Sequence, residues 1–300
     1  MNPLLKIKML LLLGIFLAQI SIAQENTQNK TQSTPQTKPI QKTSDKPKKL
    51  AENAAYNGTT FIAKTTKANP QPLKLDKKTF YWLPHPKDSK TKIAIIPINY
   101  YTKAQNANLG EGVSLEIVDG NYKKETITIT NTEKVKPNPK NQERIKRERD
   151  EANQIYSRYD SKRYWTLPFV MPMESKITSQ YGTARMFNGE IKSYHGGTDF
   201  RAAIGTPIYA SNDGVVVIAK DRFLAGGSVV ISHGEGIFSM YYHCSELKVK
   251  VGDKVKKGDL VALSGASGRV SGPHLHFGFF VNGTQVDPLD FIAKMNALDN

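Results

Sequence analysis

The sequence predicts an all-β protein in which two β-rich regions are joined by one helix. From about residue 164 onward, closely spaced runs rich in Val, Ile and Tyr end at tight turns, which indicates an antiparallel sheet. Between residues 70 and 136, shorter runs alternate apolar and polar residues, as half-buried strands do. Helical spacing is confined to one charged segment between these regions, and no longer helical pattern follows before Pro288.

The first 23 residues have the pattern of a secretory signal. Lys6 and Lys8 precede an apolar run over residues 9–20, and small residues at 21–23 suit a cleavage site. We therefore expect an exported protein. The apolar run is short for a membrane span of about 20 residues, but an uncleaved leader that tethers the protein to the membrane remains an alternative.

The remaining chain divides by composition. Residues 24–69 begin as a polar stretch of Gln, Asn, Thr, Lys and Pro, which predicts a disordered basic tether. Residues 70–136 predict a small β-sandwich-like domain, and residues 137–163 predict a connector helix with few apolar positions. The main antiparallel domain is expected over residues 164–293, followed by a tail over residues 294–300.

The net charge and the cysteine content limit which partners and which catalytic chemistry we expect for this protein. The formal net charge of +15 favours an anionic partner such as nucleic acid, a membrane surface or a wall polymer. Export argues against nucleic acid. The single cysteine, Cys244, cannot form an internal disulfide. Because neighbouring residues on a strand face opposite sides, Cys244 should point away from His243, so we expect no Cys–His nucleophilic pair.

Five of the six histidines fall between residues 195 and 276. His274 and His276 are spaced i, i+2, so a strand would direct both rings into one cleft. A catalytic zinc site uses three protein ligands and keeps one position open, and His195, Asp199 and His276 make a plausible set. His243 and His274 would then be free for proton transfer and for stabilising charge. The alternative is that these are ordinary core or surface histidines.

The same residues carry a resemblance to a known family. The segment from about residue 165 to 292 resembles the lysostaphin/LytM-type zinc endopeptidases, which cleave peptide cross-links in peptidoglycan. The matching motifs are His195-x-x-x-Asp199, Tyr241-Tyr242-His243 and Gly272-Pro273-His274-Leu275-His276-Phe277. The resemblance implies one Zn²⁺ per chain held by His195, Asp199 and His276. It also implies that His243 and His274 are catalytic, one as general base and the other steadying the oxyanion, without saying which.

The resemblance extends more weakly to residues 70–163, which look like the β-domain and helix that precede the peptidase in many exported members. It implies a DD-endopeptidase that cuts the bond from D-alanine to diaminopimelate in peptidoglycan stem peptides. Such an enzyme would remodel the wall and influence cell shape. Two alternatives stay open: a DD-carboxypeptidase that uses the same site, and a non-catalytic wall-binding or regulatory protein.

Overall fold

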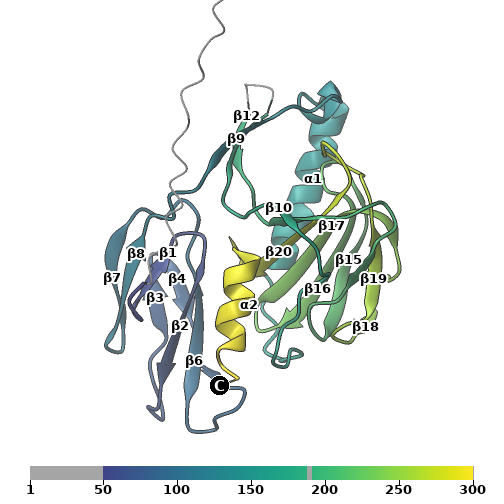
Figure 1. Cartoon of the computed structure of the whole chain (residues 1–300). Coiled ribbons are helices and arrows are strands. Elements are labelled where there is room, and N and C mark those ends of the chain that lie inside the picture. The colour runs from purple at the N-terminus through teal and green to yellow at the C-terminus, as the bar shows by residue number, and fades with distance from the viewer. Residues whose placement is uncertain (1–49, 188–190, 300) are drawn as a thin grey trace, which may run out of the picture. The chain divides into compact units, whose positions relative to one another are not determined.

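The computed structural model describes residues 50–187 and 191–299 (Figure 1). The expected leader, residues 1–23, and the expected tether as far as residue 49 lie outside the described residues. In the described segments, no helix has the length and the apolar run that a membrane span requires.

Within the described residues, a ten-stranded sheet carries the C-terminal part of the chain, green to yellow in Figure 1. Its main path runs β10-β13-β20-β17-β16-β15-β18, and its pairings are antiparallel, which confirms the predicted fold class. Its strands are β10 (Ile177–Ser179), β13 (Thr198–Arg201), β14 (Pro207–Tyr209), β15 (Gly214–Arg222), β16 (Gly226–Gly234), β17 (Ile237–Leu247), β18 (Lys254–Val255), β19 (Leu260–Ser264), β20 (His274–Val281) and β21 (Thr284–Val286).

Strand β20 shows how the sequence separates core from cleft. Leu275, Phe277 and Phe279 are fully buried and pack in one hydrophobic core. The alternate positions His274 and His276 are only partly buried. Each fully buried apolar side chain contributes about 1.5–3 kcal/mol, so the core residues fix the face on which the two imidazoles lie.

The C-terminal helix α2 (Pro288–Asn296) closes this core. Asp287 caps it by accepting hydrogen bonds from the backbone N–H groups of Leu289 and Asp290. The predicted domain end at residue 293 is wrong, because the helix continues to Asn296 and both Met295 and Leu298 are buried in the core. The expected tail 294–300 is therefore mostly part of the domain.

The front region is built from small sheets with the strand orders β1-β8-β7, β2-β6-β5 and β3-β4. The prediction of a tether up to residue 69 is wrong, because β1 and β2 lie within it and bury Ala55, Phe61 and Ala63. The short apolar runs of β1 and β2 directly follow the polar stretch before residue 50, so the composition of the whole segment predicted disorder. The strands are β1 (Ala54–Tyr56), β2 (Thr60–Thr65), β3 (Leu73–Leu75), β4 (Lys78–Phe80), β5 (Leu83–Pro84), β6 (Lys92–Pro97), β7 (Gln105–Gly110) and β8 (Val113–Val118).

Strand β6 belongs to two cores at once. Ile93 and Ile95 pack with the core of the ten-stranded sheet, whereas Ala94 and Ile96 pack inside the front region. This division follows from the period of two along a strand. Residues 49–300 accordingly form one compact unit, so the front region shares its stability with the large sheet.

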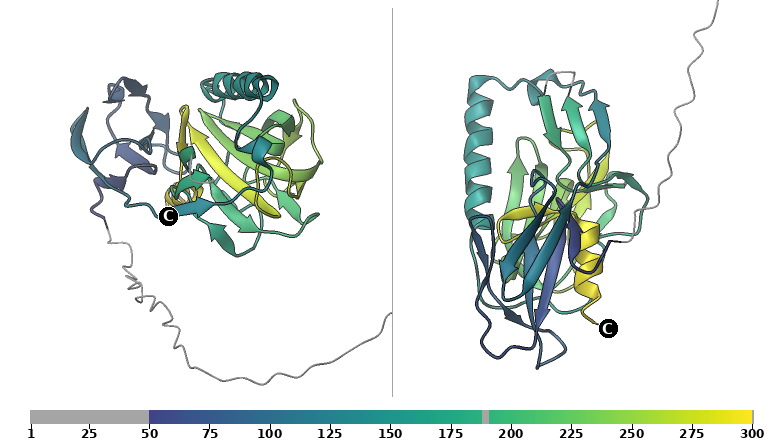
Figure 2. Two further views of the ribbon diagram at one scale, coloured as in Figure 1. Left: turned by 90° about the horizontal axis from the view of Figure 1, so that it is seen from above. Right: turned by 90° about the vertical axis from the view of Figure 1, so that its left-hand side faces the viewer.

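A helix lies in the segment where the connector helix was expected. Helix α1 (Pro139–Tyr156) follows the short 3₁₀ turn η1 (Thr132–Lys134), and Asn138 caps its N-terminus. Ala152, Ile155 and Tyr156 are its buried residues and pack on side chains of β15, β16 and β17. Figure 2 shows α1 covering one face of the large sheet.

A further three-stranded sheet joins distant parts of the chain. Its order is β12-β11-β9, formed by β9 (Lys124–Ile127), β11 (Ala184–Phe187) and β12 (Ile191–Tyr194). Strand β9 precedes α1 and pairs in parallel with β11, so a segment from the front half of the chain is built onto the structure around residue 195.

The shared core predicts the effect of a single truncation. Ile95→Ala should lower the free energy of unfolding by about 2–5 kcal/mol, because it leaves a cavity between the two regions. The matched control Ile204→Ala, at a side chain that is 63% exposed, should change it by no more than about 0.5 kcal/mol. Calorimetry should show one cooperative transition in both variants. Two separate transitions, with only the front one lowered by Ile95→Ala, would contradict the shared core.

Candidate metal centre and cleft

The register between β13 and β20 brings the predicted ligands together. Asp199 pairs with His276, and Arg201 pairs with His274. Residues opposite each other in an antiparallel pair have neighbouring side chains on the same face. His195 joins them from the end of β12, four residues before Asp199. The three residues predicted as metal ligands therefore meet at one point.

Three donor atoms converge at this point. The Nε2 atom of His195 lies 2.8 Å from Asp199 Oδ1 and 2.9 Å from His276 Nδ1, and that Nδ1 lies 3.0 Å from the same carboxylate oxygen. Ligand atoms about 2.0–2.2 Å from one zinc ion would lie about 3.3 Å apart in a tetrahedral site. Among the described residues, this is the group whose side chains could hold a metal ion.

The protonation of these groups suits a cation. His195 Nδ1 lies 2.9 Å from the carbonyl oxygen of Gln180, and because a carbonyl only accepts, Nδ1 carries the proton and Nε2 is a lone pair in the neutral ring. Burial lowers the pKa of His276 to about 4, so the His276 ring is neutral at pH 7. Burial alone would raise the pKa of the Asp199 carboxyl, but its contacts with His195 and His276 hold that pKa well below its usual range. The lone pair of His195 Nε2 faces the Asp199 carboxylate oxygen at 2.8 Å, and a cation between these two atoms would stabilise them.

Arg185 holds the other oxygen of the ligand carboxylate. Its Nη2 donates to Asp199 Oδ2 at 3.0 Å, and its Nε donates to Glu125 Oε1 at 2.8 Å. Groups that orient a ligand in this way tune metal affinity. Sequence reasoning missed both residues because Arg185 lies on β11 and Glu125 on β9, and no short spacing links either to Asp199. The parallel pairing of β9 with β11 places Glu125 opposite Arg185, and this long-range pairing cannot be read from local spacing.

His243 and His274 lie beside the ligands with their outer nitrogens available. Their ring centroids are 4.8 Å apart. Each Nδ1 donates to a backbone carbonyl at 2.8 Å, of Ser267 for His243 and of Gly272 for His274. In the neutral rings each Nε2 is therefore an acceptor, and that of His274 lies 3.7 Å from Asp199 Oδ1.

His243 sits in a strained backbone conformation. Its φ of 67° is in the left-handed region, at a point where the register of β17 shifts. Such strain in a non-glycine residue costs about 1–3 kcal/mol and tends to occur at functional sites. Burial lowers the pKa of His243 well below its usual value, so the ring is neutral and its Nε2 carries no proton.

Two other residues, Cys244 and His233, are structural. Cys244 is buried in the core, and burial raises the pKa of its thiol to about 12, so it provides no thiolate. His233 is fully buried, with Nδ1 2.7 Å from the Asp213 carbonyl and Nε2 2.8 Å from the Ser239 hydroxyl.

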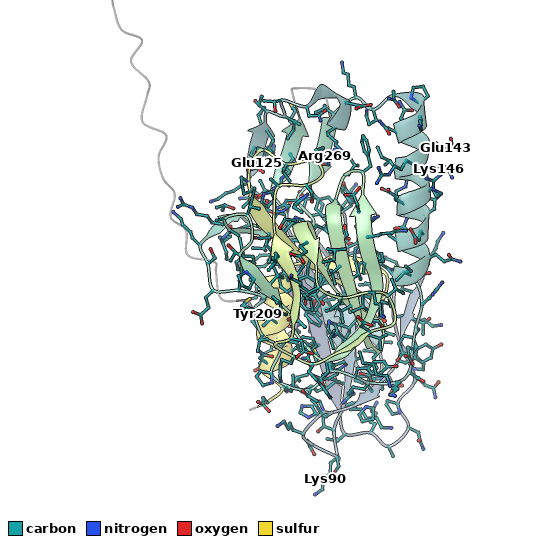
Figure 3. The ribbon with its side chains drawn as sticks, turned by 90° about the vertical axis from the view of Figure 1, so that its right-hand side faces the viewer. Lys90, Glu125, Glu143, Lys146, Tyr209 and Arg269 are labelled. Atoms are coloured by element: carbon teal, nitrogen blue, oxygen red, sulfur yellow. The ribbon has the colours of Figure 1, made fainter. Side chains whose placement is uncertain are left out.

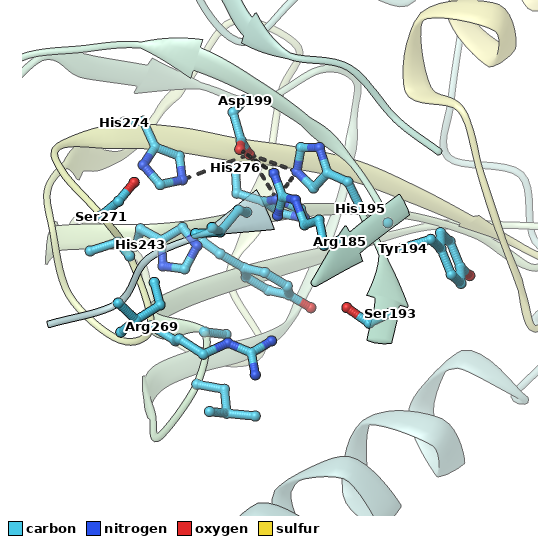
Figure 4. A pocket seen from close by; sticks show the side chains of 17 residues that line it. Arg185, Ser193, Tyr194, His195, Asp199, His243, Arg269, Ser271, His274 and His276 are labelled. Carbon is cyan, nitrogen blue, oxygen red and sulfur yellow. Dashed lines mark hydrogen bonds and ion pairs between the residues drawn. The ribbon is translucent and has the colours of Figure 1, made fainter. Parts of the chain in front are cut away.

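All five candidate residues line one cleft, shown in Figure 4. Ile127 at the end of β9, Ile129 just after it and Leu224 contribute apolar walls, while Arg185 and Arg269 contribute guanidinium groups. Glu125 and Arg269 lie toward the same end of the molecule in Figure 3, far from Lys90. The cleft is therefore built from both the large sheet and the front segment.

Two nitrogen donors and one oxygen donor that could hold a metal ion, with two further imidazoles in a cleft of an antiparallel sheet, are typical of a metallohydrolase site. Residues 193–288 match the model of Peptidase family M23, so the chain contains a domain of this metallopeptidase family.

Named proteins are similar to part of this chain. Peptidoglycan DD-endopeptidase ShyA of Vibrio cholerae is 40% identical over 147 residues, which is 43% of this chain and 34% of ShyA. ShyC of the same organism is 39% identical over 115 residues, 38% of this chain and 26% of ShyC. The chain thus spans about a third or less of these relatives. A crystal structure from Pseudomonas aeruginosa assigned to peptidase M23 matches 79% of this chain and 94% of that chain, with 27% identity and a TM-score of 0.62.

The ligand geometry predicts how metal content responds to substitution. Native protein should hold about one zinc per chain, and His276→Ala or Asp199→Ala should lose most of it, because two remaining ligands bind weakly. His85→Ala is the matched control, since His85 lies in a turn bonded to Lys87 and Asp88. Elemental analysis of purified protein measures all three variants. Full zinc content in both ligand variants would refute the assignment.

Proposed function

We propose that this chain is an exported, zinc-dependent peptidoglycan endopeptidase that cuts the bond from D-alanine to diaminopimelate. The observation that carries the proposal is the convergence of His195, Asp199 and His276 beside two imidazoles with free Nε2 atoms. The match to peptidase family M23 supports a peptidase, and the names of ShyA and ShyC support a DD-endopeptidase acting on peptidoglycan.

Two sets of residues would share the chemistry: His195, Asp199 and His276, which we call the metal group, and the two histidines outside it, His243 and His274. When bound at His195, Asp199 and His276, zinc would supply Lewis acidity that polarises the scissile carbonyl and lowers the pKa of water. The Nε2 atom of His243 or His274 is placed to take a proton, because its Nδ1–H is already fixed on a carbonyl. Once protonated, that Nε2 can donate to the departing nitrogen. The second ring can steady an oxyanion only when its own Nε2 carries a proton.

The electrostatics and the leader support action on the wall outside the cytoplasmic membrane. The net charge of +15 suits a polymer that carries carboxylates. The signal-like pattern of residues 1–23 supports export, and we propose the periplasm as the compartment. Hydrolysis of cross-links there would loosen the wall and influence cell shape.

The two free imidazoles predict a separation of metal binding from turnover. His243→Ala and His274→Ala should each keep the zinc and the fold, because neither ring is among the three converging ligands. Each should lower kcat by about 100-fold or more through loss of acid–base catalysis. Zinc analysis, thermal unfolding and a turnover assay measure the three properties. Near wild-type turnover in either variant would exclude that residue from the chemistry.

The proposed bond predicts the products formed from purified sacculi. Cross-linked dimers should fall while tetrapeptide monomers rise by the matching amount, as separated muropeptides would show. The His274→Ala protein is the control and should leave the dimers intact.

Other products would point elsewhere. Unchanged dimers with shortened stems would identify a DD-carboxypeptidase on the same site. Shortened glycan strands would contradict a peptidase altogether.

A further inference from the structure

The row of paired residues that carries two of the candidate ligands continues one strand further. His276 on β20 pairs with Asp199 on β13 on one side and with Tyr242 on β17 on the other. Residues directly opposite each other on neighbouring antiparallel strands have their side chains on the same face. Tyr242 accordingly lines the same cleft as Asp199 and His276. Its phenol ring is the next side chain beyond His276 in this row.

The ring of Tyr242 lies parallel to the imidazole of His276. Their ring centroids are 5.6 Å apart and the ring planes differ by 4°, which is the offset parallel arrangement that aromatic pairs favour. Gly197 directly precedes β13, and its backbone approaches the imidazole so closely that a Cβ atom there would lie 2.6 Å from His276 Nε2. The imidazole is thus confined between Gly197 and Tyr242, with its Nδ1 directed at Asp199.

Helix α1 holds the far end of the Tyr242 side chain. The Tyr242 hydroxyl lies 2.9 Å from the hydroxyl of Tyr156, the last residue of α1. Tyr156 is buried, and its ring stacks on Phe280 of β20 with the ring centroids 3.9 Å apart. Burial raises the pKa of Tyr156 well above its usual value, so its hydroxyl stays protonated and can donate to Tyr242.

Contacts between α1 and β15 keep Tyr156 in place. The Glu148 carboxylate accepts a hydrogen bond at 2.8 Å from the backbone N–H of Phe223, which directly follows β15. The backbone carbonyl of Glu148 accepts from Arg222 Nη2 at 3.0 Å. The Arg222 guanidinium carbon also lies over the Tyr242 ring, 5.9 Å from its centroid. The packing of the helix on the sheet therefore determines where the Tyr242 ring can lie.

We propose that Tyr242 is a positioning residue for the ligand His276, and that helix α1 sets its place through Tyr156. The inference rests on the proposed function, because it concerns the ion that the metal group would hold. Groups that fix the orientation of a ligating imidazole raise metal affinity. The cost of ordering the His276 ring is met when the protein folds, so it does not weaken the binding of the ion.

The test measures the dissociation constant of zinc by competition with a chelator of known affinity. Tyr242→Leu removes the ring that stacks on His276 and should weaken zinc binding by about 10- to 100-fold. Tyr242→Phe and Tyr156→Phe each remove one hydroxyl of the same hydrogen bond, so each should weaken it by about 2- to 10-fold. The double Phe variant should lose no more affinity than the more affected single variant, because both changes break one interaction.

Tyr241→Phe is the matched control, because it removes a hydroxyl from the neighbouring residue of the same strand, on the core side. That hydroxyl accepts from the backbone N–H of Ser211 at 2.8 Å. Its loss should lower the melting temperature of the metal-free protein and leave the zinc dissociation constant unchanged. If Tyr242→Leu does not fold, the result for Tyr156→Phe decides, since that variant keeps both rings.

Unchanged zinc affinity in the folded Tyr242 and Tyr156 variants would overturn the positioning role, as would an equal loss of affinity in Tyr241→Phe. Wild-type protein that binds no zinc would instead overturn the proposed function, and the positioning role with it.

Discussion

The pairing of β13 with β20 is the constraint on which the site depends. It places Asp199 opposite His276 on the cleft side and Phe200 opposite Leu275 on the core side. A slip by one residue would send every side chain to the other face. The buried aromatic and aliphatic residues that stabilise the sheet therefore also keep Asp199 opposite His276. The same core packing thus contributes to the free energy of folding and fixes the geometry of the candidate metal site.

A second constraint comes from outside the large sheet. Strand β9 precedes α1, yet it supplies Glu125 to Arg185 and, with Ile127, a wall of the cleft. The chain of contacts from Glu125 through Arg185 to Asp199 links the front half of the protein to a ligand. Together with the placement of Ile93 and Ile95 in the main core, this makes the front region part of the site's support.

Local spacing explains what could be predicted. The i, i+2 pair His274 and His276 and the i, i+4 pair His195 and Asp199 show their shared faces within a few residues, and the structure brings them together. The closely spaced apolar runs that end at tight turns likewise predicted the antiparallel sheet. These features need no knowledge of distant partners.

Long-range pairing explains what could not be predicted. Strand β1 pairs in parallel with β8, about sixty residues away, so the short run around Ala55 gave no sign of a sheet against its polar surroundings. The role of Arg185 depends on its contacts with Glu125 on β9 and Asp199 on β13, which lie far from each other in the sequence. Helix α2 continues past residue 293 because Met295 and Leu298 are buried in the core. In each case tertiary contacts override the local composition.

Anomalous diffraction at the zinc absorption edge tests the central claim most directly. Crystals of the zinc-loaded protein should show one strong peak about 2.0–2.2 Å from His195 Nε2, an Asp199 carboxylate oxygen and His276 Nδ1. The Nε2 atoms of His243 and His274 should lie beyond bonding distance from that peak. A peak bonded to either of those two histidines, or none at the three converging ligands, would contradict the account.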